Sequence, residues 1–197
     1  MSLPTGQAGL RFYRVFDWDG SAQDDRPGGP LHVPRHLQGS SRFDIPHIDG
    51  VLYTSLVELS AVVEALQGFR TKRITNRHFE RPDGRRLASA VFEMGDIAEI
   101  VDLDDHAALH KLSVRPSEIM THDRETTHVL AERLFNEGYS GILWPSTREA
   151  SWKNATLFQS RALPKLRLAS NIQPLNVKLP VVKQAIEWLN MTLSRSR

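Results

Sequence analysis

The residues best suited to chemistry in this chain are Arg42, Tyr53 and Glu64, which follow one another at steps of eleven residues. An arginine guanidinium binds phosphate through two parallel hydrogen bonds, and an aromatic ring attracts a cationic ring. With a carboxylate to hold ribose hydroxyls, the three could bind the phosphate, the ring and the ribose of a nicotinamide dinucleotide. Each also has an ordinary alternative: a surface arginine paired with Asp44, a half-buried core tyrosine and a solvated helix glutamate.

Local sequence signals place these residues on a turn, a strand end and a helix. Arg42 follows a Gly-Ser-Ser turn, and Tyr53 lies in a short strand predicted over 51–54. A capping box beginning at Ser55, followed by apolar residues at helical spacing, predicts a helix from that residue. Glu64 lies off the apolar stripe, among small residues that would allow close approach to the backbone.

The rest of the chain predicts interspersed strands and helices. Strands are expected at 12–16, 90–92, 97–101, 141–144 and 154–158, and helices at 123–136 and from 180 to about 193. A long loop rich in Gly, Pro and Asp is expected over 17–41. We therefore predict an α+β fold with a mixed sheet. We expect one domain over 1–197, with a core of about 12–163 and a C-terminal extension, 164–197, that carries a helix.

Composition narrows the class of protein. Hydrophobic residues make up 40% of the chain and charged residues 24%, which is ordinary for a globular protein. No apolar run could span a bilayer, and the N-terminal residues lack the apolar stretch of a signal peptide. The absence of cysteine excludes disulfides, thiolate nucleophiles and cysteine-based zinc sites. A cytoplasmic protein without a membrane partner is expected.

A basic segment at 70–86 stands out against a net charge of only +2. It holds seven Arg and Lys residues and only Glu80 and Asp83 as acids. The plainest interpretation is a solvated hairpin that turns at 82–84. The alternatives are an anionic ligand or an acidic partner surface. A nucleic-acid-binding or ribonuclease-like toxin that uses this segment is therefore the alternative function.

A metal site is not expected. His106 and His110 are four residues apart near several aspartates, but no third ligand is defined. A helix start rich in acidic residues explains this segment better, because the helix dipole favours negative charge there.

Several short motifs together resemble a known family. They are FYRVF with Arg14, SRF with Arg42, LYTS with Tyr53, AVVEAL with Glu64, GYSGILWPSTR with Ser146, and NATLF with Asn154. Their order and spacing, over roughly 12–158, resemble the RES domain, the toxin half of a bacterial toxin–antitoxin system. The chain departs from the family pattern in having Ser41 where glycine usually precedes the arginine, and in a longer loop between Arg14 and Arg42.

The resemblance implies a fold related to ADP-ribosyltransferases and a reaction that consumes NAD+. NAD+ would be the substrate, with no separate cofactor, and its nicotinamide–ribose bond would be cleaved. Glu64, Arg42 and Tyr53 would be catalytic, and Arg14, Ser146 and Asn154 would join Arg42 and Tyr53 in binding NAD+. Ser146 is not expected to act as a nucleophile, because no His/Asp relay lies near it in the sequence.

The resemblance also implies a partner. RES toxins pair with an antitoxin that carries an Xre-like helix-turn-helix domain, so DNA would be contacted only through that antitoxin. The acceptor of the ADP-ribosyl group is left open between water, phosphate and a protein side chain. Whether the chain forms a homodimer is likewise open.

Overall fold

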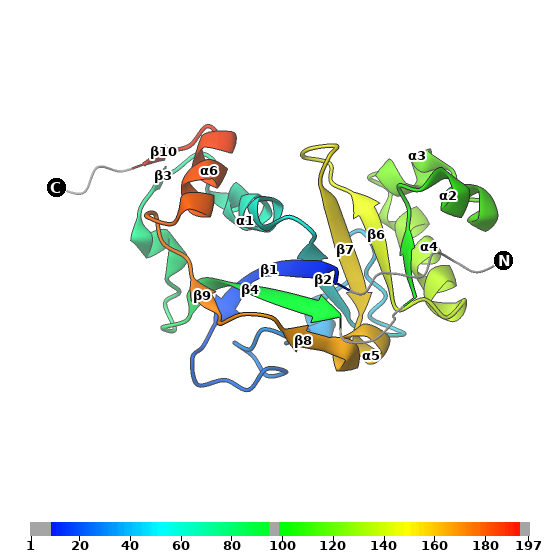
Figure 1. Ribbon diagram of the computed structural model, residues 1–197, viewed down its shortest axis with the longest axis horizontal. Coiled ribbons are helices and arrows are strands. Elements are labelled where there is room, and N and C mark those ends of the chain that lie inside the picture. Colours follow the sequence, from blue (N-terminus) through cyan, green and yellow to red (C-terminus); the bar gives the residue numbers. More distant parts are fainter. Residues whose placement is uncertain (1–8, 95–98, 194–197) are drawn as a thin grey trace. The chain divides into compact units, whose positions relative to one another are not determined.

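The computed structural model describes residues 9–94 and 99–193, which fall into two compact units (Figure 1). The first unit comprises Met1–Arg11, Val33–Thr54 and Glu93–Arg167, and the second comprises Phe12–His32, Ser55–Phe92 and Leu168–Arg197. Each unit is described below by itself. The expected single domain, with an extension from residue 164, stays a prediction.

The first unit contains a mixed sheet and four helices. Its strands are β5 (Ile100–Asp102), β6 (Gly141–Pro145), β7 (Lys153–Phe158) and most of β2 (Val51–Ser55). Its helices are α2 (His106–Leu112), α3 (Pro116–Met120), α4 (Arg124–Asn136) and α5 (Gln159–Ala162). β5 pairs with β6 in parallel, whereas β6 pairs with β7 antiparallel. The predicted α+β class with a mixed sheet is therefore confirmed.

Helices α2, α3 and α4 pack against this sheet. Leu109, Ile119 and Leu134, one from each helix, belong to the same buried cluster as Val101 of β5 and Ile142 of β6. Burying large aliphatic side chains stabilises such a layer by about 1.5–3 kcal/mol each. This packing fixes the ends of α3 and α4, where several residues of the candidate site lie.

The start of α4 confirms the predicted helix boundary. Asp123 is the N-cap, and its carboxylate accepts a hydrogen bond of 3.0 Å from the backbone N–H of Glu125. Gly138 follows the end of the helix with φ of +100°, a conformation that glycine adopts at no steric cost. Arg124 is thereby held as the first residue of a thirteen-residue helix.

The second unit combines antiparallel strands and one parallel two-stranded pair with a pair of helices. Its strands are β1 (Arg11–Trp18), β4 (Arg86–Met94), β9 (Gln173–Pro174), β3 (Arg73–Ile74) and β10 (Thr192–Leu193), with the last residue of β8 (Leu166–Leu168). Tyr13 of β1 faces Ser55, the last residue of β2, and β4 pairs antiparallel with β9. Helices α1 (Glu58–Leu66) and α6 (Pro180–Trp188) lie side by side (Figure 1) and contact one another through buried apolar side chains.

Two helix boundaries differ from those predicted. Helix α1 begins at Glu58, so the capping box predicted at Ser55 is wrong. Ser55 still belongs to β2, and its hydroxyl accepts a 3.2 Å hydrogen bond from the N–H of Val57, where the backbone remains extended. Helix α6 ends at Trp188 rather than near 193, because Asn190 adopts a left-handed φ of 53°. Of the strand predicted at 97–101, β5 is the observed part, and 97 and 98 lie outside the described residues.

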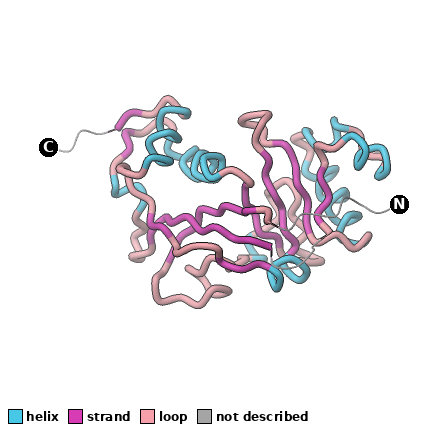
Figure 2. The backbone as a smooth tube through the Cα atoms, viewed as in Figure 1, coloured by secondary structure: helices cyan, strands magenta, loops and turns pink. Residues whose placement is uncertain are grey.

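A long connection follows β1, as predicted. Figure 2 shows the segment between β1 and β2 as loop, interrupted by a 3-10 turn at Arg35–Leu37. In the second unit, the guanidinium of Arg14 donates hydrogen bonds to the carbonyl oxygens of Pro30 and His32. Gly29 is packed against its own loop, where an added Cβ would lie 2.6 Å from the carbonyl carbon of Asp24. The first part of this connection is therefore a fixed structure.

Replacing Gly29 by alanine should lower the free energy of unfolding by about 1–3 kcal/mol, the usual cost of overpacking. The new methyl group would meet the backbone carbonyls of Gln23 and Asp24, which cannot move without opening the loop. Urea denaturation measures the change. Gly68→Ala is the matched control, because a Cβ at that exposed glycine would meet nothing within 4 Å. Equal stability of both variants would contradict the close packing at Gly29.

The length and hydropathy of each helix decide whether it could cross a membrane. Within residues 9–94 and 99–193, every helix is too short or insufficiently apolar to cross a bilayer.

Candidate functional site

The turn that carries Arg42 is built around Asp44. One carboxylate oxygen of Asp44 accepts hydrogen bonds from the backbone N–H groups of Gly39, at 2.7 Å, and Ser41, at 2.8 Å. Gly39 has φ of +130°, which a residue with a side chain rarely adopts. Asp44 is almost completely buried. The acid therefore fixes the backbone that leads into Arg42, rather than forming the ion pair with Arg42 that is the ordinary alternative.

Arg42 is buried, with only 7% of its surface exposed. Its Nη1 donates to the backbone carbonyls of Ile119 and Thr121, the second at 2.7 Å, at the C-terminal end of α3. The guanidinium lies 5.4 Å from the ring centre of Trp144. Nη1 carries two hydrogens, so it can make both of these bonds by itself. The N–H groups on Nε and Nη2 are therefore available to other acceptors.

The electrostatic setting of Arg42 is unusual for an arginine. Burial lowers the pKa of Arg42 below its ordinary value, and the neighbouring cation of Arg124 lowers it further, while Tyr53 acts in the opposite direction. Each cause reflects the cost of holding positive charge away from water or beside another positive charge. A bound anion would offset both costs.

Tyr53 is fixed through its hydroxyl group. The hydroxyl donates to the free oxygen of Asp44 at 2.8 Å and accepts from the backbone N–H of Phe43 at 3.0 Å. Burial raises the pKa of Tyr53 well above its usual value, and the adjacent Asp44 carboxylate raises it further. Tyr53 is therefore a neutral phenol whose ring orientation is set. Such a ring can serve as a stacking surface but does not supply a proton at neutral pH.

Ser146 and Asn154 lie on the hairpin that joins β6 to β7. Asn154 pairs with Trp144 across the hairpin, so it is placed beside the ring that Arg42 contacts. Both Ser146 and Asn154 are buried. The backbone N–H of Ser146 donates to the carbonyl of Trp152 at 2.8 Å, and its hydroxyl accepts from the N–H of Arg148 at 3.1 Å. Ser146 thus holds the turn, and among the described residues no His/Asp relay contacts it.

Arg14 and Glu64 belong to the second unit. The two loop carbonyls that Arg14 contacts occupy both of its terminal nitrogens, and burial lowers the pKa of Arg14 to about 10. Arg14 therefore anchors the loop that follows β1, and its expected contact with NAD+ stays a prediction. Glu64 is exposed on α1, which also packs against α6. Its catalytic role likewise stays a prediction.

Four of the six predicted site residues lie in the first unit, namely Arg42, Tyr53, Ser146 and Asn154, and their joint role in one site stays a prediction. Sequence reasoning missed two further residues of this region. Asp44 was considered only as a partner of Arg42, and Arg124 was not singled out. A carboxylate three residues after a Gly-Ser-Ser turn was an available signal for Asp44, since such acids commonly accept from nearby backbone N–H groups.

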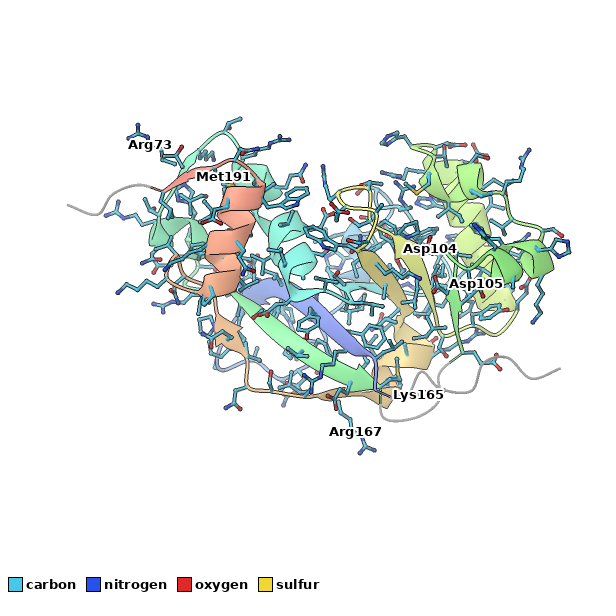
Figure 3. All side chains as sticks on the ribbon, turned by 45° about the horizontal axis from the view of Figure 1, so that its top comes forward. Arg73, Asp104, Asp105, Lys165, Arg167 and Met191 are labelled. Carbon is cyan, nitrogen blue, oxygen red and sulfur yellow. The ribbon has the colours of Figure 1, made fainter. Side chains whose placement is uncertain are left out.

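The other motifs have structural explanations. Asp105 caps α2 by accepting from the N–H of Ala107 at 3.0 Å, so His106 begins that helix. Lys153 contacts Asp102 at 2.7 Å and Asp104 at 3.2 Å; Asp104 and Asp105 are labelled in Figure 3. Among the described residues, no three potential metal ligands come together.

Residues 80–86 of the basic segment form the predicted hairpin, whereas Arg73–Ile74 belong to β3 and Asn76–Phe79 form a 3-10 helix. The N–H of Arg81 donates to the carbonyl of Arg85 at 2.8 Å, which closes the turn at 82–84. Arg81 pairs with Asp17 and Arg85 with Asp83. Arg73, labelled in Figure 3, projects from its strand into solvent. These contacts are those of a solvated hairpin.

Comparison with known proteins places the chain among its relatives. The model of the RES domain matches residues 11–178. No curated protein matches the sequence. A solved structure, the crystal structure of the M. tuberculosis MbcT-MbcA toxin-antitoxin complex, is similar in fold, with a TM-score of 0.57 and 15% sequence identity. The similarity covers 92% of this chain and 89% of that chain. Because the family model spans most of the sequence, this chain belongs to the RES domain family.

Proposed function

We propose that this protein is a toxin that consumes NAD+ by cleaving its nicotinamide–ribose bond. The observation that carries the proposal is the arrangement of Arg42, Tyr53 and Asp44. It combines a buried cation, whose Nε and Nη2 contact no acceptor among the described residues, with a neutral aromatic ring held in one orientation. Membership of the RES domain family supports the same reaction class.

The chemistry of the bond explains why these residue types are suitable. Nicotinamide leaves from a ribose that develops positive charge, as in other glycosyl transfers with oxocarbenium-like transition states. A carboxylate fixed beside that ribose stabilises the developing charge, and Glu64 is our candidate. Tyr53 would stack on the cationic nicotinamide ring, Arg42 would bind pyrophosphate, and Ser146 would hydrogen-bond the ribose or the amide.

We further propose that the chain pairs with an antitoxin. The similar solved structure is a complex of a toxin with an antitoxin. An antitoxin with a helix-turn-helix domain would bring any DNA contact, so that this chain need not bind DNA itself. Co-expression with the product of the adjacent reading frame, followed by size-exclusion chromatography, would test whether a stable complex forms.

Incubation of the purified chain with NAD+ should release free nicotinamide in proportion to the NAD+ lost. Both species are measured by liquid chromatography, in buffer alone, with inorganic phosphate, and with a protein extract as acceptor. The form in which the ADP-ribosyl group is recovered identifies the acceptor. A folded protein that leaves NAD+ unchanged under all three conditions would contradict the proposed reaction.

A further inference from the structure

Arg124 has a buried donor that no acceptor among the described residues satisfies. Its Nε donates to the carbonyl oxygen of Ser40 at 3.2 Å, which directs the side chain toward the turn that carries Arg42. One helical turn further on, His128 donates to the carbonyl of Ser41 at 2.8 Å, so this face of α4 lies along that turn. The Nη1 of Arg124 is buried, and no acceptor contacts it among the described residues. An unpaired buried N–H is costly, so it indicates a missing partner.

The local charges indicate the sign of that partner. Arg124 lies close enough to Arg42 to lower the pKa of Arg42. Asp44 is the nearby acid, but Tyr53 binds one of its oxygens and two backbone N–H groups bind the other. Neither arginine forms an ion pair within the described residues. The region therefore holds two cations whose available donors face no carboxylate.

We propose that Arg42 and Arg124 together bind a phosphate group. Guanidinium groups suit this ligand because their planar N–H pairs match two phosphate oxygens. The ring of Trp144 lies beside the guanidinium of Arg42 and favours its positive charge. We assign this phosphate to the pyrophosphate of the dinucleotide, an assignment that rests on the proposed function. Free inorganic phosphate is the other source of the same chemistry. Arg124 is then a substrate-binding residue that the family motifs of the sequence do not include.

Isothermal titration with inorganic pyrophosphate, inorganic phosphate and ADP-ribose tests the site directly. Arg124→Gln should weaken pyrophosphate binding about 10-fold to 100-fold, the usual effect of losing a charged hydrogen bond. Lys111→Gln is the control, because it removes the same charge from an exposed residue of α2. An unchanged affinity in Arg124→Gln, or an equal loss in Lys111→Gln, would overturn the proposal.

A second variant distinguishes a loss of binding from a loss of folding. Arg124→Lys keeps the positive charge but lacks the planar fork, so we expect intermediate affinity with an unchanged melting temperature. If Arg124→Lys binds pyrophosphate as tightly as the wild-type protein does, only the charge matters and the paired geometry is wrong. A parallel loss of ADP-ribose affinity in Arg124→Gln assigns the site to the dinucleotide, whereas a loss for inorganic phosphate alone assigns it to free phosphate.

The two proposals can fail separately. If the wild-type protein binds pyrophosphate through Arg124 but releases no nicotinamide, the phosphate site stands and the proposed reaction fails. If the wild-type protein degrades NAD+ while Arg124→Gln binds pyrophosphate normally, the reaction stands and the two-arginine site fails.

Discussion

Replacing Glu64 by glutamine should reduce nicotinamide release by at least about 100-fold while leaving the fold intact, since losing one charge-stabilising group at a transition state typically costs that much. The amide keeps the size of the side chain but removes the negative charge that would face the oxocarbenium-like ribose. Because Glu64 is exposed on α1, the substitution should change the free energy of unfolding by less than about 1 kcal/mol.

The matched control is Glu58→Gln on the same helix. Glu58 is the first residue of α1, so its replacement removes the same charge about two turns away from Glu64. Comparing kcat of the three proteins, with circular dichroism to verify folding, separates a specific role from the general effect of charge. If Glu64→Gln turned over NAD+ at the wild-type rate, another carboxylate would have to stabilise the ribose cation.

The elements that local patterns define were predictable. Strand β6 begins at Gly141 and ends at Pro145, and α4 begins after an N-cap and ends before Gly138; both lie where the sequence places them. The start of α1 was not predictable, because Ser55 has the residue types of a capping box but is held in β2 by pairing with Tyr13. Tertiary pairing outweighs a weak local signal there.

The candidate site was predictable in its residue types but not in its contacts. Arg42 bonds to carbonyls at Ile119 and Thr121, nearly eighty residues away, and no periodicity in the sequence reports such a contact. Arg124 looks like an ordinary first-turn residue of a helix. Its importance follows only from the approach of α4 to the turn at Ser40, which depends on the packing of the whole unit.

Replacing Arg42 by alanine should lower the free energy of unfolding by about 3 kcal/mol, because the buried carbonyl of Ile119 and the half-buried carbonyl of Thr121 would both lose their donor. Arg115→Ala is the control. Arg115 pairs with Glu118 on α3, and its side chain is 79% exposed, so its loss should cost less than about 1 kcal/mol. Urea denaturation of both variants measures the difference, and equal costs would contradict the structural role of Arg42.

Arg42→Lys separates the structural role of this residue from its part in binding. An ammonium group retains the charge, but it cannot donate to the two carbonyls and present a planar fork to phosphate at the same time. We therefore expect Arg42→Lys to recover part of the stability lost in Arg42→Ala, yet to bind ADP-ribose about as weakly as the alanine variant. Recovery of stability and binding in parallel would contradict the need for a planar fork, because a positive charge at a correctly folded turn would then suffice for binding.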